Sequence, residues 1–326
     1  MKDVFRREID YLRISITDKC NLRCVYCMPE EGIKLRPHLE ILRFEEILEL
    51  VKVAADLGIS KVRITGGEPL VRRGVVPFIR DLTRIPGIKD VAMTTNGVLL
   101  PKLGPELKRA GLNRLNISLD TLEPEKFRKI TRVGNLHQVW EGIEAALDLK
   151  FGPIKINTVV MRGINDDEIL DFVRLIFLYP LHVRFIECMP IGEADGWAQQ
   201  SMVPQAEIKA RVEERFRLEP SDDHILGAGP AQYYQVPGAL GSLGFISPIT
   251  AHFCPACNRL RLTSDGRLRP CLNSRWEIDL KEPLRAGASK EELSRLFLEA
   301  VKKKPQCHSM SEGTWDQPRM MYQIGG

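Results

Sequence analysis

The sequence predicts an α/β fold: a partial TIM-type barrel of six parallel strands, followed by a smaller α+β C-terminal module. Strand-like and helix-like segments alternate as far as Glu187, and this alternation favours parallel strands joined by right-handed crossovers. Glycine and polar residues gather just after several different strands, as they do at the carboxyl ends of TIM-barrel strands. Six strands are two fewer than a closed barrel of eight requires, so we expect the barrel to be open along one side.

The six barrel strands are predicted from short runs that are apolar or that alternate apolar with polar residues. The first run, residues 11–16, is rich in β-branched residues, and the others lie at 61–65, 90–94, 114–119, 154–160 and 182–187. Residues 44–57 carry apolar side chains at the 3.6-residue period of a helix and stop at Gly58. Further helices are expected at 101–110, 136–149 and 166–178.

The alternating pattern ends near Pro220. After it we expect a loop, two short strands and a closing helix, at 221–230, 232–236, 243–246 and 290–303. The sequence therefore predicts two domains: the barrel, residues 1–220, and the C-terminal module, residues 221–326.

The composition is that of a globular protein, with 44% hydrophobic and 28% charged residues. The formal net charge of +4 is too small to indicate a nucleic-acid-binding surface. The first residues lack the apolar core of a signal peptide, and no apolar run reaches the 18 residues of a membrane span. We therefore expect a cytoplasmic protein that binds neither nucleic acid nor membrane. In that reducing compartment, metal binding is the expected role of most of the eight cysteines.

Three cysteines lie within eight residues directly after the first predicted strand, in the spacing Cys-x3-Cys-x2-Cys; this first cysteine trio is Cys20, Cys24 and Cys27. Cysteine thiolates are the usual ligands of iron–sulfur clusters. In a [4Fe–4S] cube, three cysteines leave one iron open, and an open metal position is typical of reactive rather than structural sites. The alternatives are a zinc knuckle completed by a residue such as His38, or three core cysteines on one helical face. Pro29 and Gly32 argue against a long helix here.

A second cysteine trio has the spacing Cys-x2-Cys-x13-Cys: Cys254, Cys257 and Cys271. By itself this spacing is typical of a zinc ribbon, with His252 or Cys307 as the fourth ligand. In a chain that already carries the first trio, a second [4Fe–4S] cluster with another open iron is the better interpretation.

Two arginines, Arg259 and Arg261, alternate on a predicted strand at 258–263 between these ligands, so both side chains point to one face. Guanidinium groups beside a metal centre offer forked donors and a permanent charge, which suits phosphate. The alternative is an edge strand whose charges face solvent.

The first trio, with Tyr26 before its last cysteine, resembles the cluster motif of the radical S-adenosylmethionine (SAM) superfamily. Together with the second trio, it makes the chain resemble the molybdenum cofactor biosynthesis protein A family, the GTP 3′,8-cyclases. The resemblance covers nearly the full chain. Its other matching segments follow in order at 13–20, 64–69, 94–97, 116–120, 155–158, 187–190, 258–263 and 325–326.

The resemblance implies a role for each motif residue. It assigns the first trio to the SAM-binding cluster and the second trio to a cluster whose open iron binds the guanine of GTP. The residues expected to line the SAM site are Tyr26, Gly67, Ser118 and Met189. Those expected around GTP, mainly its phosphates, are Arg13, Arg63, Thr94, Lys155, Arg259 and Arg261.

Glycine has a physical meaning at two of these places, because a residue without a Cβ allows close backbone approach. At Gly67 it would admit the amino-acid end of SAM, although an ordinary turn is the alternative. The resemblance implies that Gly325 and Gly326 thread into the active site and position the substrate; a disordered chain end is the alternative. For Arg13, Arg63 and Lys155 the alternative is a surface charge on a strand.

The reaction that the resemblance implies is a cyclisation. A 5′-deoxyadenosyl radical from SAM removes hydrogen from ribose C3′ of GTP, and C3′ then bonds to C8 of guanine. The product, 3′,8-cyclo-7,8-dihydro-GTP, begins molybdopterin synthesis and passes to cyclic pyranopterin monophosphate synthase. The implied electron donor is flavodoxin- or ferredoxin-like, and the protein is expected to be a monomer or homodimer. The rival interpretations are a radical SAM peptide-modifying enzyme with an auxiliary cluster, and a zinc-stabilised binding protein.

Overall fold

Six parallel strands, in the same order as in the sequence, form the centre of the computed structural model, which describes every residue except 35, 192–195, 222–228, 311–318 and 326. Each pairs in parallel with the next. They are β1 (Tyr11–Ser15), β2 (Lys61–Thr65), β3 (Asp90–Thr95), β4 (Arg114–Ser118), β5 (Ile154–Val160) and β6 (Leu181–Glu187). The prediction of six parallel strands is confirmed, and the predicted ends agree within one residue.

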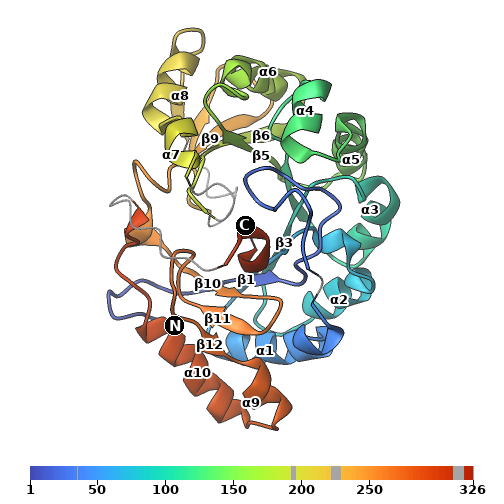
Figure 1. Cartoon of the computed structure of the whole chain (residues 1–326), viewed down its shortest axis with the longest axis vertical. Coiled ribbons are helices and arrows are strands. Elements are labelled where there is room, and N and C mark those ends of the chain that lie inside the picture. Colours follow the sequence, from blue (N-terminus) through green and yellow to red (C-terminus); the bar gives the residue numbers. More distant parts are fainter. Residues whose placement is uncertain (35, 192–195, 222–228, 311–318, 326) are drawn as a thin grey trace.

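Six helices form an outer ring around the strands (Figure 1): α1 (Phe44–Asp56), α2 (Val75–Leu82), α3 (Leu100–Arg109), α4 (Pro124–Thr131), α5 (Leu136–Asp148) and α6 (Ile169–Leu178). The four predicted helices are α1, α3, α5 and α6, the last preceded by a 3-10 turn, η3 (Asp166–Glu168). The sequence analysis missed α2 and α4. Each has only eight residues, about two turns, which is too short for the helical period to stand out.

The C-terminal segment adds strands to both edges of the barrel sheet. On one edge β9 (Ser242–Ile246) pairs in parallel with β6, and on the other β10 (Arg259–Leu262) pairs in parallel with β1. Antiparallel strands follow outside them: β8 (Gln232–Gln235) and β7 (Glu219–Ser221) beyond β9, and β11 (Arg267–Arg269) and β12 (Ile278–Asp279) beyond β10. The strand order is therefore β12-β11-β10-β1-β2-β3-β4-β5-β6-β9-β8-β7. The domain boundary at residue 220 stays a prediction.

The remaining helices belong to the C-terminal half: α7 (Ala198–Ser201), α8 (Gln205–Glu213), α9 (Lys281–Arg285), α10 (Lys290–Lys302) and α11 (Met321–Ile324). Helix α10 is the predicted closing helix, whereas the one-turn helix α11 lies at the centre of the ring (Figure 1). In the part of the chain that the structure describes, no helix is long and apolar enough to cross a membrane.

The barrel strands separate an apolar layer from a polar interior. Side chains such as Val62, Ile64 and Leu115 are fully buried in the hydrophobic core. The alternate positions of the same strands carry polar and charged residues that are also buried, among them Arg63 and Asn116. Because neighbouring residues of a strand point to opposite faces, the sheet collects these polar groups inside the barrel.

A glycine inside α5 provides a test of the packing between this helix and the loop after β3. A Cβ on Gly142 would lie 2.2 Å from the carbonyl oxygen of Gly97, which is backbone and cannot turn aside. We therefore expect Gly142→Ala to lower the free energy of unfolding by about 1–3 kcal/mol, despite the better helix propensity of alanine. The measurement is the thermal unfolding midpoint of the anaerobically prepared protein.

The matched control is Gly104→Ala inside α3, where the added Cβ would lie 2.8 Å from Cδ1 of Leu149. That atom ends a flexible side chain that can rotate away. The higher helix propensity of alanine offsets the cost of this rotation, so the control should unfold near the wild-type midpoint. Equal midpoints for the two variants would show that α5 can move away from the loop.

Candidate functional site

The first cysteine trio lies in the loop after β1, at the carboxyl end of the barrel strands. Backbone N–H groups of Cys27 and Met28 donate to the carbonyl of Cys24 at 2.9 and 3.1 Å, which closes a turn. The segment forms turns rather than a helix, so the alternative of three cysteines on one helical face is wrong. All three thiols are free. The backbone N–H of Leu22 donates to the sulfur of Cys20 at 3.3 Å.

Among the described residues, no three His, Cys, Asp or Glu side chains converge so as to hold one metal ion. Each trio offers three free cysteines, and cysteine thiolates are the usual ligands of iron–sulfur clusters.

Tyr26 is held in place by a carboxylate at the end of β4. Its hydroxyl donates to Oδ2 of Asp120 at 2.6 Å, and the other oxygen of Asp120 accepts the backbone N–H of Val159 at 2.9 Å. Burial raises the pKa of Asp120 to about 6, although both hydrogen bonds oppose this rise. The ring of Tyr26 is therefore fixed beside the first trio. Ser118 is the last residue of β4, two positions before Asp120.

Gly67 packs directly against the segment that leads into the first trio. A Cβ there would lie 2.5 Å from the carbonyl oxygen of Lys19 and 2.7 Å from that of Asp18. Its backbone N–H donates to the carbonyl of Thr17 at 2.7 Å. The absence of a side chain is thus required by chain packing, in addition to the close approach of SAM expected from the resemblance.

Two residues beside the first trio were missed by the sequence analysis. Glu68 is buried and accepts hydrogen bonds from Leu70 N, Thr95 Oγ1 and Asn96 N, so it joins the ends of β2 and β3. Burial raises the pKa of Glu68 to about 7. The amide nitrogen of Asn96 lies 4.0 Å from the sulfur of Cys20. The sequence did carry a signal for both residues, because each lies in a polar segment that follows a predicted strand: Glu68 after 61–65 and Asn96 after 90–94.

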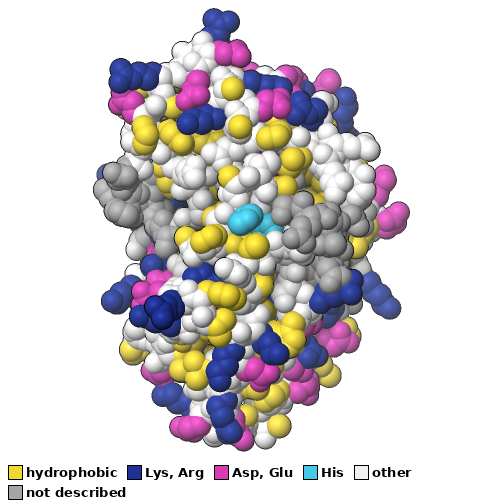
Figure 2. All heavy atoms as spheres, turned by 90° about the vertical axis from the view of Figure 1, so that its left-hand side faces the viewer, with side chains coloured by type: hydrophobic (Ala, Val, Ile, Leu, Met, Phe, Trp, Pro, Cys, Tyr) yellow, Lys and Arg dark blue, Asp and Glu magenta, His cyan; other side chains and the backbone are white. Residues whose placement is uncertain are grey.

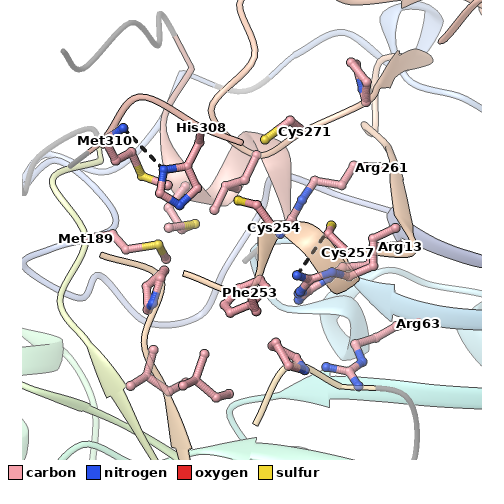
Figure 3. Close-up of a pocket in the computed structure, with 18 of the residues that line it drawn as sticks. Arg13, Arg63, Met189, Phe253, Cys254, Cys257, Arg261, Cys271, His308 and Met310 are labelled. Atoms are coloured by element: carbon pink, nitrogen blue, oxygen red, sulfur yellow. Dashed lines mark hydrogen bonds between the residues drawn. The ribbon is translucent and has the colours of Figure 1, made fainter. Parts of the chain in front are cut away.

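The second cysteine trio lines a cavity together with four of the residues expected at the site, Arg13, Arg63, Arg259 and Arg261 (Figure 3). Cys254 begins a 3-10 turn, η6 (Cys254–Ala256), directly before β10, and Cys271 follows β11. Met189, from the loop after β6, lines the same cavity. The trio and the arginines are therefore brought together, as the sequence analysis expected.

Two cations stabilise the thiolate form of Cys257. Burial raises its pKa, but Arg259 and Lys304 more than offset this and lower it to about 6. The ammonium of Lys304 lies 3.4 Å and a guanidinium nitrogen of Arg259 lies 3.7 Å from the sulfur. Because the thiolate is the form that binds metal, Cys257 is suited to bind a metal cluster. Lys304 is another residue that the sequence analysis missed.

A row of buried and half-buried cations crosses the barrel beside this trio. Arg13 on β1 is opposite Arg261 on β10 and Arg63 on β2. Burial lowers the pKa of Arg13, and Arg261 and Arg63 lower it further. Burial, then Arg184 and other cations, lower the pKa of Lys155 to about 6. Charges of one sign buried together favour an anionic ligand, because an anion offsets both their desolvation and their mutual repulsion.

Two polar atoms in this row lack a partner within the described protein: Nε of Arg63 and Oγ1 of Thr94 are buried without a hydrogen bond. Buried polar groups are normally paired, so these atoms are available to a ligand. Arg184 on β6 is a further cation of this interior that was not predicted from the sequence; its guanidinium donates to Oδ1 of Asn157 at 2.8 Å and of Asn116 at 2.7 Å.

The chain end reaches this interior. Nη1 of Arg261 donates to the carbonyl oxygen of Gly325 at 2.7 Å. A Cβ on Gly325 would lie 2.2 Å from Oγ1 of Thr65, and its φ of +78° favours glycine. Gly325 therefore lies inside the barrel between β1 and β2, whereas Gly326 lies outside the described residues.

Helix α11 lies between the two trios. Met321 lines the cavity of the second trio, and the backbone of Tyr322 lies close enough to the thiol of Cys27 in the first to oppose the rise that burial causes in the pKa of that thiol. On the side of the molecule shown in Figure 2, hydrophobic side chains and a histidine occupy the middle, and charged side chains gather toward both ends.

Comparisons with known proteins identify the family. Residues 14–176 match the family model described as the radical SAM superfamily, and residues 181–310 match Molybdenum Cofactor Synthesis C. The GTP 3′,8-cyclase of Heliobacterium modesticaldum is 58% identical over 330 residues, and that of Moorella thermoacetica is 55% identical over 326. Both alignments cover 100% of this chain and of the relative.

Solved structures show the same fold at low identity. Native anSMEcpe with bound AdoMet has a TM-score of 0.59 at 16% identity, covering 92% of this chain and 82% of that one. Streptococcus suis SuiB bound to S-adenosylmethionine also has a TM-score of 0.59 at 16% identity, covering 88% and 67%. With both family models and two full-length relatives in agreement, the chain belongs to the GTP 3′,8-cyclase family of the radical SAM superfamily.

Proposed function

We propose that the protein converts GTP into 3′,8-cyclo-7,8-dihydro-GTP, the first step of molybdenum cofactor biosynthesis, using SAM and two [4Fe–4S] clusters. The observation that carries the proposal is that one short helix, α11, touches both cysteine trios beside a row of buried and half-buried cations. A single nucleotide in this interior would meet a radical source, a second metal centre and a set of phosphate ligands together.

The first trio would hold the cluster that binds SAM, with Tyr26, Gly67, Ser118 and Met189 around it. When bound, these groups would supply a 5′-deoxyadenosyl radical for the removal of one hydrogen atom from ribose C3′. Bond formation between C3′ and C8, with one further electron and one proton, would then give the product. The protein's share is to hold the reacting atoms in contact and to exclude water.

The cations would hold the substrate at its triphosphate, and the second trio would hold a cluster whose open iron meets the guanine. Arg13, Arg63, Lys155, Arg259 and Arg261 supply the charge, and Thr94 adds a hydroxyl. A triphosphate bound here would also favour the charged form of Lys155, whose pKa burial and like charges lower to about 6.

Partners, a location and an oligomeric state complete the proposal. The electrons would come from a flavodoxin- or ferredoxin-like protein, and the product would pass to cyclic pyranopterin monophosphate synthase. The expected location is the cytoplasm, as a monomer or homodimer.

The direct test is an anaerobic assay of reconstituted protein with SAM, dithionite and each of the four nucleoside triphosphates. We expect 5′-deoxyadenosine, methionine and a cyclised nucleotide with GTP alone. Cleavage of SAM without any cyclised nucleotide, whichever triphosphate is present, would favour the alternative of a peptide-modifying enzyme.

Iron content tests the two clusters. We expect about eight irons per chain after full anaerobic reconstitution, because two cubes of four irons fit two trios. Replacing Cys20, Cys24 and Cys27 with alanine should halve the iron and abolish SAM cleavage, while the second trio keeps its cluster. About four irons in the wild-type protein would contradict a second cluster.

The arginines of β10 are tested by nucleotide binding. A charge-assisted contact contributes about 1.5–3 kcal/mol, so Arg259→Ala or Arg261→Ala should weaken GTP binding at least tenfold. The loss should be much smaller for guanosine, which lacks the phosphates.

The matched control is Arg295→Ala, because Arg295 is an exposed arginine on α10. This control should bind GTP like the wild type. Equal losses for GTP and guanosine would show that Arg259 and Arg261 maintain the fold or the cluster instead of holding phosphate.

A further inference from the structure

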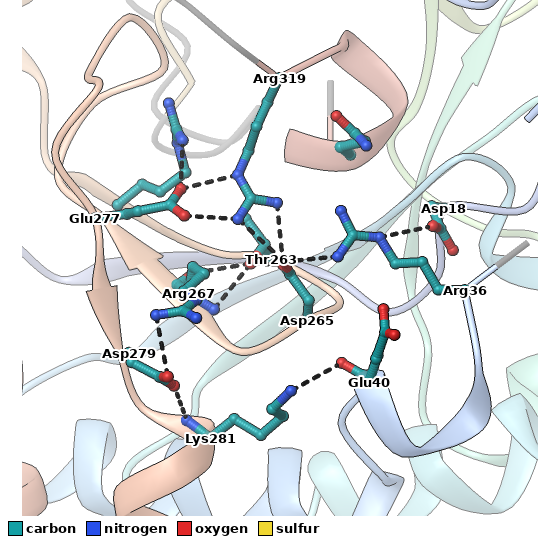
Figure 4. A network of polar contacts seen from close by, with 12 residues as sticks. Asp18, Arg36, Glu40, Thr263, Asp265, Arg267, Glu277, Asp279, Lys281 and Arg319 are labelled. Carbon is teal, nitrogen blue, oxygen red and sulfur yellow. Dashed lines mark hydrogen bonds and ion pairs between the residues drawn. The ribbon is translucent and has the colours of Figure 1, made fainter. Parts of the chain in front are cut away.

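A network of ion pairs joins the chain end to both cysteine loops (Figure 4). Its centre is Asp265, in the turn between β10 and β11. One carboxylate oxygen accepts from Arg36 at 2.9 Å, and Arg319 donates to both oxygens at 3.1 and 3.0 Å. The hydroxyl of Thr263, at the end of β10, donates to the same carboxylate at 2.5 Å. Three segments far apart in the sequence therefore meet on one side chain.

Arg36 connects Asp265 to the loop of the first trio. Its Nε lies 3.4 Å from Oδ2 of Asp18, two residues before Cys20. The backbone carbonyl of Asp18 also packs against Gly67. The side chains of Asp18 and Asp265 are 3% and 11% exposed, so solvent screens these pairs only weakly.

Arg319 connects Asp265 to the loop of the second trio. On its other side it donates to both oxygens of Glu277, at 2.8 and 2.6 Å. Glu277 also accepts from the buried Arg269 at 2.7 Å, two residues before Cys271. One guanidinium thus makes forked contacts with two carboxylates, the geometry for which arginine is best suited.

The position of Arg319 decides where the chain end lies. The next residue, Met320, is the N-cap of α11, and Gly325 follows directly after that helix. A four-residue helix is about 6 Å long and, by itself, is not stable. The placement of α11 and Gly325 therefore depends on tertiary contacts: the buried side chains of Tyr322 and Ile324, the network at Arg319 and the hydrogen bond from Arg261.

We propose that Arg319, Asp265 and Arg36 are positioning residues, which fix α11 and Gly325 in place between the two cysteine loops. The inference rests on the proposed cyclisation, because a chain end in this place would position the nucleotide against the radical source. Among the described residues, the hydrogen bonds and ion pairs of Arg319, Asp265 and Arg36 go to neither the trios nor the row of cations, so their effect would be transmitted through α11.

The test uses Arg319→Ala and Asp265→Asn in the full chain, with two measurements. Hydrogen exchange of the peptide that covers 320–325, followed by mass spectrometry, should be at least tenfold faster in both variants. This readout requires no activity. In the second measurement, the amount of cyclised product per 5′-deoxyadenosine formed should fall at least tenfold, while iron content and GTP affinity stay near wild type.

Reference variants make the result specific. Deletion of 325–326 should give the same low product ratio, and Arg319→Lys should recover part of the exchange protection because it keeps the charge but loses the fork. Arg162→Ala, which removes an exposed ion pair with Glu207 on the outside of the barrel, should change neither measurement. If Arg319→Ala does not fold, Asp265→Asn and Arg36→Gln carry the test.

Several outcomes would overturn the proposal. Unchanged exchange at 320–325 in both variants would show that the network does not anchor the chain end. Fast exchange with an unchanged product ratio would show that the anchor has no role in the reaction. Failure of the wild-type protein to cyclise GTP would refute the proposed function instead, and the exchange result would still decide whether the network anchors the chain end.

Discussion

The parallel pairing of β10 with β1 is the contact on which the candidate site depends. It joins segments about 248 positions apart in the sequence. Asp10 secures the junction on both sides: one oxygen accepts from the amide of Asn258 at 2.6 Å and the other pairs with Lys61 at 2.7 Å. Without this pairing, the second trio would have no fixed position relative to the barrel.

The same pairing sets the charge of the interior. Because the register places Arg13 opposite Arg261 and Arg63, three guanidinium groups lie in one row across three strands. Burying them together is unfavourable in the absence of an anion. The sheet obtains its stability elsewhere, from the apolar side chains that pack beneath the helices. The fold can therefore maintain an interior whose charge is suited to a highly charged anion.

The loops at the carboxyl ends of the strands are held by buried carboxylates rather than by regular secondary structure. Asp120 orients Tyr26, Glu68 joins the ends of β2 and β3, and Asp265 joins three separate segments. Buried hydrogen-bonded carboxylates fix geometry strongly, since loss of either partner leaves an unpaired polar group. Rigid loops of this kind suit a reaction in which atoms must be brought into contact and protected from water.

The sequence by itself determined most of the elements and the candidate ligand sets, because both are local patterns. Period and length predicted β1–β6 within one residue at each end, and spacing identified both cysteine trios. Alternation placed Arg259 and Arg261 on one face. The two missed helices, α2 and α4, are too short to show their period.

Only the tertiary structure decided which distant groups meet. The pairing of β9 and β10 with opposite edges of the barrel, the role of Lys304 beside Cys257, and the network around Asp265 all join segments with no shared local pattern. Gly325 lies in the interior because Arg261 donates to its carbonyl oxygen and because, lacking a Cβ, it fits against Thr65 and Ser15. Such contacts depend on how whole strands align and on which buried charges pair with one another. Neither can be predicted from the spacing of neighbouring residues.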